Sequence, residues 1–307
     1  MNKIYDVLTQ VNKVIKGKDD IVVKVMAAIL AGGHVLMEDI PGVGKTTLST
    51  KFAKALSMDY KRVQFTPDVL PSDILGFSMY NSNSKQFEYM PGPIFCNFFL
   101  ADEINRTSPK TQSALLEVME EGNVTVDGVT RKLSDTFVVV ATQNPSGSAG
   151  TNLLPESQLD RFLVRLSMGY PSHNDWVDIL KSRSVSDHDE VIPVLSIENL
   201  KEMKKEVENI FVHDSIYEYI TMLCEETRNN PLFSAGVSPR GGIALLRISK
   251  AYAYIMGNEF VRAQDVQAVV TDVFCHRVKL SAKAKTNGMD VNAAIKEMLK
   301  VVTPPRQ

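Results

Sequence analysis

The segment 34–48, HVLMEDIPGVGKTTL, constrains the fold more than any other part of the chain. Its short apolar run, Val35–Met37, predicts a buried strand. A loop containing Gly42 and Gly44 follows, and Gly-Lys-Thr then opens a segment that we expect to stay helical to about residue 57. Glycines let backbone N–H groups turn inward around a phosphate, and the start of a helix adds a partial positive charge. The order of strand, glycine loop and helix therefore predicts a phosphate-binding loop.

The residues that end this loop have the side chains that a nucleoside triphosphate requires. Lys45 would reach the β- and γ-phosphates, and the hydroxyl of Thr46 would hold Mg²⁺. The generic pattern G-x-x-x-x-G-K-S/T has its first glycine where this chain has Asp39, so the strict pattern fails at one position. An ordinary turn between a strand and a helix is the alternative interpretation. The residues predicted to bind the nucleotide in this loop are Pro41, Gly42, Val43, Gly44, Lys45, Thr46 and Thr47.

Length and composition indicate a globular protein of two domains. The chain has 307 residues, of which 44% are apolar and 23% are charged, and a domain usually takes ~100–200 residues. The net charge of −2 provides no basic excess that would indicate a nucleic-acid partner. No apolar run approaches the ~20 residues that span a bilayer, and the N-terminus has no apolar signal core. The three cysteines, Cys96, Cys224 and Cys275, lack metal-type spacing, so we expect reduced thiols in a cytoplasmic protein without a membrane segment.

Two adjacent carboxylates follow an apolar run at residues 95–100. This run predicts a strand that delivers Asp102 and Glu103 to the carboxyl edge of the sheet, where ligands bind in open α/β sheets. Asp102 would bind Mg²⁺, directly or through water, and Glu103 would polarise the attacking water. Two solvated carboxylates at a strand end are the alternative. After a strand predicted at 61–65, residues 66–95 alternate turn formers with apolar residues, which is typical of a functional loop.

A glycine junction precedes the phosphate-binding loop. Residues 2–15 predict an amphipathic helix and residues 21–31 a second helix, with Gly17 breaking the pattern between them. In a nucleotide-binding domain, such a junction can form the floor of the adenine pocket. A simple turn between two helices explains it equally well.

A second polar side chain is expected beside the two carboxylates. The apolar run 137–142 predicts a buried strand, and Asn144 follows it. Its amide could hydrogen-bond the γ-phosphate or the attacking water, or it could only cap the turn before Pro145. Between the carboxylates and this strand, Ser108 to Gly122 predicts a capped helix. Asp127-Gly128 then predicts a hairpin, which either projects from the domain or is a plain connection.

Two arginines stand at helix boundaries. Arg161 precedes a last strand predicted at 162–168. It could pair with Asp160 or another acid of its own chain, or act as an arginine finger on a neighbouring subunit, and side-chain chemistry alone favours the intramolecular pair. Arg240 follows Ser238-Pro239, which predicts a helix start. A cation near a helix N-terminus suggests a shared anion, and an exposed surface arginine is the alternative.

The pattern changes after residue 171. Residues 172–195 are polar, and the remainder has a period near 3.6 without strand alternation, which predicts a second domain that is entirely helical. The helices predicted in it are 197–209, 215–228, 240–256, 263–274 and 291–302.

The chain resembles the MoxR group of AAA+ ATPases over essentially its whole length. The motifs that carry the resemblance are EDIPGVGKT at 38–46, QFTPDVLPSD at 64–73, DEINR at 102–106, ATQNP at 141–145, LPE through DRF at 154–162 and SPR at 238–240. The resemblance implies an α/β fold, a parallel five-stranded αβα P-loop core at 1–170 with an insert in helix 2 at about 66–95. It also implies a linker at 171–195 and a helical lid domain at 196–307.

Roles for individual residues follow from the same resemblance. Lys45 and Thr46 match the Walker A lysine and Mg²⁺ ligand, and Asp102 and Glu103 match Walker B. Asn144 matches sensor 1, Arg161 the arginine finger and Arg240 sensor 2. Asp39, which stands where the generic pattern has its first glycine, matches the residue that this family has at that position. Gly241-Gly242 after Arg240 is less usual in a helix's first turn, so whether Arg240 serves its own or a neighbour's nucleotide stays open.

The function implied is Mg²⁺-dependent ATP hydrolysis at the subunit interfaces of a homo-oligomeric ring, a hexamer in similar proteins. Family members resemble chaperones that remodel partner proteins or insert metal into them, often partners with a von Willebrand factor A domain. A magnesium-chelatase-like motor subunit and a DNA-remodelling ATPase are the alternatives, the second disfavoured by the acidic net charge. A scaffold that binds ATP without turnover is disfavoured by the presence of both Glu103 and Arg161.

Overall fold

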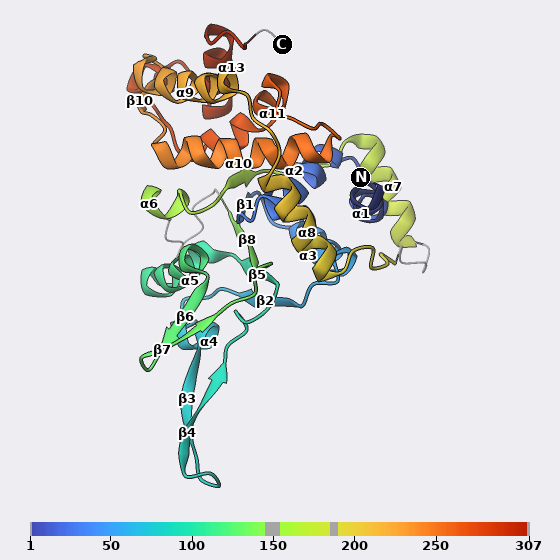
Figure 1. Ribbon diagram of the computed structural model, residues 1–307, viewed down its shortest axis with the longest axis vertical. Helices are drawn as coiled ribbons and strands as arrows, with labels where there is room; N and C mark the ends of the chain where they lie inside the picture. The colour runs from blue at the N-terminus through green and yellow to red at the C-terminus, as the bar shows by residue number, and fades with distance from the viewer. Residues whose placement is uncertain (1, 145–153, 185–189, 306–307) are drawn as a thin grey trace.

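The computed structural model describes residues 2–144, 154–184 and 190–305. Figure 1 shows an elongated molecule, with a helical region at one end, a sheet flanked by helices in the middle and a projecting hairpin at the other end. No helix within the described ranges combines the length and apolar content needed to cross a bilayer.

A parallel five-stranded sheet forms the centre, as predicted. The strands lie in the order β2-β5-β8-β1-β9, and every neighbouring pair is parallel. The register places Glu38 beside Gln143 and Gln64 beside Asp102, so polar side chains from four strands gather at one carboxyl edge. The strands are β1 (Val35–Glu38), β2 (Tyr60–Gln64), β5 (Phe98–Asp102), β8 (Val138–Gln143) and β9 (Val164–Leu166).

Alternation along the buried strands builds two hydrophobic layers. Phe98 and Leu100 of β5 face one core, whereas Phe99 of the same strand faces the other, because successive side chains point to opposite faces of a sheet. The first layer is covered by α1 (Asn2–Val14), α2 (Asp19–Leu30) and α3 (Lys45–Ala55). The second is covered by α5 (Pro109–Glu121), so the sheet lies between helices on both faces (Figure 1).

Local sequence signals set the ends of several elements. The Ser108 hydroxyl accepts a hydrogen bond from the Thr111 N–H (3.3 Å), and Gly122 ends α5 with φ of +64°. Asp127 and Gly128, with φ of +52° and +75°, connect β6 (Asn123–Val126) to β7 (Val129–Lys132).

The segment expected as a loop at 66–95 contains regular structure. It holds a short helix, α4 (Pro71–Leu75), and an antiparallel hairpin of β3 (Gly76–Asn81) and β4 (Gln86–Pro91). This hairpin extends away from the sheet and the helices (Figure 1). The pattern of apolar and turn-forming residues in this segment is too interrupted for periodicity to reveal two strands.

The helical part contains the five predicted helices, with ends that differ from the prediction by at most one residue. They are α8 (Ile197–Glu208), α9 (Asp214–Asn229), α10 (Pro239–Ile255), α11 (Ala263–Phe274) and α13 (Val291–Val301). The second domain was predicted to be entirely helical, but it contains one antiparallel pair of strands, β10 (Phe233–Ala235) and β11 (Lys279–Leu280). These strands are too short to show alternation in the sequence. Two further helices were not predicted, α7 (His173–Ser184) within the expected linker and α12 (Ala282–Thr286).

Candidate nucleotide-binding and catalytic site

The phosphate-binding loop joins β1 to α3. Gly42 and Gly44 have φ of +86° and +97°, the left-handed region that favours glycine, and Gly44 directly precedes the helix. Lys45 is buried at the first position of α3. Its ammonium donates to the carbonyl of Asp39 (2.6 Å) and to the carbonyl of Ile40 (3.3 Å), so it lies across the loop.

The electrostatic surroundings of Lys45 connect this loop to the neighbouring strands. Burial lowers the pKa of Lys45, and the carboxylates of Asp39, Asp102 and Glu103 oppose that shift. The structure therefore brings the predicted Walker A lysine and both predicted Walker B carboxylates into one site. The predicted loop residues around it are half-buried or exposed: Pro41, Val43, Thr46 and Thr47.

Asp39 makes contacts that its sequence position did not reveal. Its buried carboxylate accepts hydrogen bonds from the Ser167 hydroxyl (2.9 Å), the Met168 N–H and the Gly169 N–H (3.1 Å). These donors follow β9, so Asp39 ties the phosphate-binding loop to the segment that leaves the sheet.

Asp102 ends β5 between two donors. One carboxylate oxygen accepts from the Arg62 guanidinium, with Nη2 at 2.7 Å and Nε at 3.2 Å. The other accepts from the Thr142 hydroxyl (2.6 Å). Arg62 was not predicted as a site residue. A basic residue on β2, the strand that neighbours β5, could have indicated an ion pair with the carboxylate at the end of β5.

Glu103 follows Asp102 in the left-handed conformation, with φ of +58°. Its N–H donates to the Thr142 hydroxyl (2.9 Å), which fixes the backbone. Its carboxylate accepts from Gln64 Nε2 and from Arg106 Nη1, both at 2.8 Å. A left-handed non-glycine residue costs roughly 1–2 kcal/mol, and such strain concentrates at functional sites.

Asn144 lies just beyond β8, beside the same edge, and is half-buried. Its backbone carbonyl accepts from Asn105 Nδ2 (3.3 Å). The turn at Pro145, which is the alternative explanation for Asn144, falls outside the described residues.

Arg161 and Arg240 share one partner. Both guanidiniums contact the Glu120 carboxylate at the end of α5, at 3.2 Å for Arg161 and 2.7 Å for Arg240. The acid that Arg161 pairs with is therefore Glu120, whereas Asp160 pairs with Arg277. Within the described ranges, no hydrogen bond or ion pair joins either arginine to Lys45 or to the two Walker B carboxylates.

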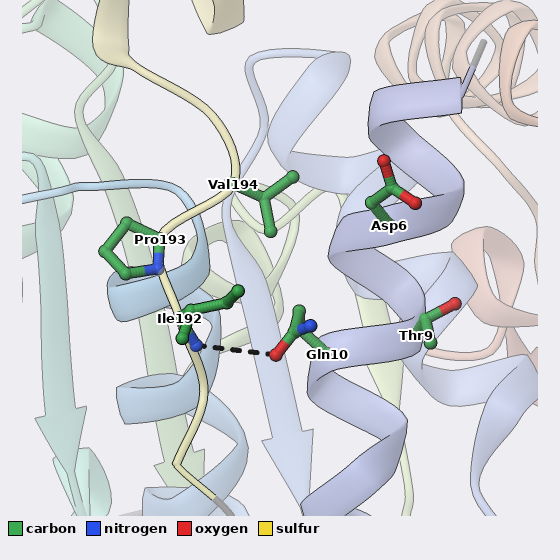
Figure 2. Close-up of a pocket in the computed structure, with 6 residues that line it drawn as sticks. All are labelled: Asp6, Thr9, Gln10, Ile192, Pro193 and Val194. Atoms are coloured by element: carbon green, nitrogen blue, oxygen red, sulfur yellow. Dashed lines mark hydrogen bonds between the residues drawn. The ribbon is translucent and has the colours of Figure 1, made fainter.

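Gly17 lies in the exposed turn between α1 and α2, with φ of +65°. A Cβ added there would lie 2.1 Å from a carboxylate oxygen of Asp175, and Lys18 next to it donates to the Tyr170 carbonyl (2.9 Å). The turn thus contacts the start of α7. A separate pocket of about 260 Å³ lies between α1 and residues 192–194 (Figure 2), and it includes none of the predicted site residues.

Comparison with known proteins places this geometry in a family. Residues 34–164 match the model of the ATPase family associated with various cellular activities (AAA), and residues 225–298 match the AAA lid domain. Chaperone MoxR1 of Mycobacterium tuberculosis is 35% identical over 306 residues, which cover 97% of this chain and 81% of that protein. The chain belongs to the MoxR family of AAA+ ATPases.

Other relatives agree with this assignment. The uncharacterized protein YeaC of Bacillus subtilis is 50% identical over 298 residues, which cover 97% of this chain and 93% of that protein. A crystal structure of a presumed ATPase from Cytophaga hutchinsonii is 34% identical, with a TM-score of 0.91 and coverage of 99% of this chain and 96% of that one. As a MoxR-family AAA+ ATPase, the chain binds and hydrolyses ATP.

Several polar residues support the AAA+ site from the neighbouring strands. Gln64 and Arg62 come from β2, and Thr142 comes from β8. Each contacts one of the two predicted Walker B residues. Gln64 and Thr142 lie within motifs that carry the family resemblance, but the resemblance assigns no role to them or to Arg62. Only the strand order of the folded sheet brings them beside β5.

Proposed function

We propose that this AAA+ protein hydrolyses ATP in Mg²⁺-dependent sites that a neighbouring subunit completes, and that turnover remodels a client protein. One observation carries the proposal. Arg161 and Arg240 both contact Glu120, and within the described residues neither makes a hydrogen bond or ion pair with the half-site that contains Lys45, Asp102 and Glu103. Because these arginines make no such contact with the half-site of their own chain, we propose that they contact a nucleotide bound to a neighbouring subunit.

The first half-site would bind the triphosphate. The N–H groups of the loop from Gly42 to Thr46 would surround the phosphates, and Lys45 would exchange its loop carbonyls for β- and γ-phosphate oxygens. Thr46 and Asp102 would hold Mg²⁺, which would neutralise charge on the phosphate oxygens. Their hydroxyl and carboxylate oxygens are the donors that Mg²⁺ prefers, and Asp102 already accepts a cationic partner in Arg62.

The remaining polar groups would act on the water and the γ-phosphate. Glu103 would orient and polarise the attacking water, with Gln64 and Arg106 fixing its carboxylate beforehand. Asn144 would hydrogen-bond the γ-phosphate or that water. Gly17 would lie beneath the adenine, where its turn meets the start of α7.

The second half-site would come from the adjacent subunit. Arg161 would stabilise the charge that develops on the neighbour's γ-phosphate, and its ion pair with Glu120 would open for this. Because Arg240 shares that carboxylate, we propose that it too acts in trans, in a ring that is a hexamer.

The client would bind the projecting β3–β4 hairpin, which carries exposed aromatic side chains. We propose a protein client, with a von Willebrand factor A domain, that is remodelled or loaded with metal. Nucleic acid is disfavoured, because the basic residues of the β6–β7 hairpin are engaged within the chain. Arg131 lies over the Tyr89 ring (3.7 Å), and Lys132 pairs with Asp135 (2.7 Å).

Steady-state ATPase activity against protein concentration tests the shared site. We expect the rate per subunit to rise with concentration, and Glu103→Gln to abolish turnover. Arg161→Ala should lower it by roughly 10³-fold or more, the usual value of a trans arginine. Arg262→Ala is the matched control, since Arg262 also pairs with an acid of its own chain (Asp265, 3.0 Å) and should leave the rate unchanged. A flat rate per subunit, or an active Arg161→Ala variant, would contradict the proposal.

A further inference from the structure

Arg277, just after α11, has contacts that nucleotide binding does not explain. Its side chain is 3% exposed, although arginine is rarely buried unless it is paired. Burial lowers its pKa, and the ion pair with Asp160 opposes that shift. A guanidinium has five N–H donors in a rigid plane and keeps its charge, so its position depends on the acceptors around it.

Most of those acceptors belong to the residues on either side of Arg161 in the chain. The guanidinium of Arg277 donates to the carbonyls of Asp160 (3.2 Å), Phe162 (2.6 Å) and Leu163 (3.2 Å), and Nε donates to the Asp160 carboxylate (2.6 Å). The residues before and after Arg161 are thus held by one side chain from another part of the chain.

The same guanidinium is fixed on the lid side. Nη1 also donates to the Val273 carbonyl (2.6 Å) of α11 and lies 2.7 Å from His276 Nε2. A Cβ added at Gly241 would lie 2.8 Å from Arg277 Cδ, so the first turn of α10 packs directly against this side chain. The glycine that follows Arg240 therefore leaves room for Arg277. In Figure 1, the N-terminal end of α10, α6 (Glu156–Leu159) and α5 lie on the same side of the molecule.

We infer that Arg277 is a positioning residue for Arg161, through which the lid helices set the place of the arginine that completes the neighbouring subunit's site. This inference rests on the trans role proposed above. Arg277 does not touch the nucleotide; it fixes the backbone on both sides of the residue that does.

Arg247 provides a matched comparison within the lid. It is an exposed arginine of α10 whose guanidinium donates to the core carbonyls of Ala31 (2.7 Å) and Gly32 (3.2 Å). It therefore joins the lid to the core as Arg277 does, but at the α2–β1 connection and away from Arg161.

The test uses co-expressed pairs of inactive full-length variants. Glu103→Gln subunits keep Arg161 but cannot hydrolyse ATP, and Arg161→Ala subunits keep Glu103 but lack the arginine. Mixed equally, they form hybrid interfaces, and ATPase activity should recover to roughly a quarter of wild type under random assembly. Without recovery, the trans site itself is contradicted, and the inference about Arg277 falls with it.

Arg277→Gln is then added to one partner at a time. In the Glu103→Gln partner, which supplies Arg161, it should lower the recovered activity at least tenfold. In the Arg161→Ala partner, which has no arginine to position, the recovered activity should be unchanged. Equal losses in the two arrangements, or no loss in either, would overturn the inference, because general destabilisation acts on both partners alike.

Two further variants keep the test interpretable. Arg277→Lys retains the charge but loses the planar donor set, so it should show the same asymmetry even if Arg277→Gln does not fold. Arg247→Gln should affect both arrangements equally or neither. An asymmetric loss with Arg247→Gln would mean that any lid–core contact has this effect, and would also overturn the inference.

Discussion

Asp39 shows how a single side chain can define the phosphate-binding loop of this protein. Its backbone carbonyl accepts from Lys45, while its carboxylate accepts from Ser167, Met168 and Gly169. The residue therefore connects the lysine of the loop to the chain that leaves β9. A glycine here, as in the generic motif, would leave those donors without this partner.

We expect Asp39→Ala to lower the free energy of unfolding by about 2–4 kcal/mol, because it removes a buried charged acceptor from several donors. It should also weaken ATP binding, since the loop loses its connection to residues 167–169. Urea unfolding and nucleotide titration measure the two effects.

Asp6→Ala, on the exposed side of α1, is the control and should stay within about 0.5 kcal/mol of wild type. If Asp39→Ala is equally mild, the carboxylate does not hold the loop.

The β3–β4 hairpin extends away from the sheet and the helices (Figure 1). Gly76 begins it with φ of +98°, and a Cβ there would lie 2.3 Å from the Met90 carbonyl, so only glycine fits without a shift. Phe77 and Phe87 are 48% and 75% exposed. Side chains with this much exposure contribute little to the stability of the fold. Because they are exposed, they are also accessible to a client protein.

Phe87→Ser should therefore change the free energy of unfolding by no more than about 0.5 kcal/mol and leave basal ATPase activity per subunit unchanged. Phe65→Ala, at a fully buried position in the second core layer, should cost about 3–5 kcal/mol. Chemical denaturation and ATPase assays compare the two variants. A large loss of stability in Phe87→Ser would show that the hairpin packs against the body of the protein.

At the scale of the whole molecule, the lid and the core share one hydrophobic cluster. Buried side chains of α1 and α2 belong to the same cluster as those of α10 and α11. Lys24 of α2 also pairs with Asp272 of α11 at 2.8 Å, and Arg247 reaches the carbonyl of Ala31. Separating the two parts would expose apolar surface and break both the Lys24–Asp272 ion pair and the hydrogen bond from Arg247.

Scanning calorimetry should accordingly show one cooperative transition, with calorimetric and van't Hoff enthalpies that agree for the dilute protein without nucleotide. Lys24→Met should lower the transition temperature while keeping a single transition. Two resolved transitions in the wild type would mean that core and lid unfold independently.

Consecutive residues carried enough information to predict the phosphate-binding loop, the caps of α5, the turn at Asp127-Gly128 and the strand that ends in Asp102. Turn chemistry, capping and periodicity act between neighbours in the chain, so they can be recognised without a structure. The parallel five-stranded sheet and the helical lid followed from those elements and from the resemblance to the MoxR family.

Only the tertiary structure decided which distant residues meet. Glu120 pairs with both Arg161 and Arg240, Arg62 pairs with Asp102, and Arg277 holds the carbonyls around Arg161. These partners come from different elements, and their side chains meet because sheet order and helix packing place them together. A local pattern records which side chains are present, whereas their partners depend on how the whole chain packs.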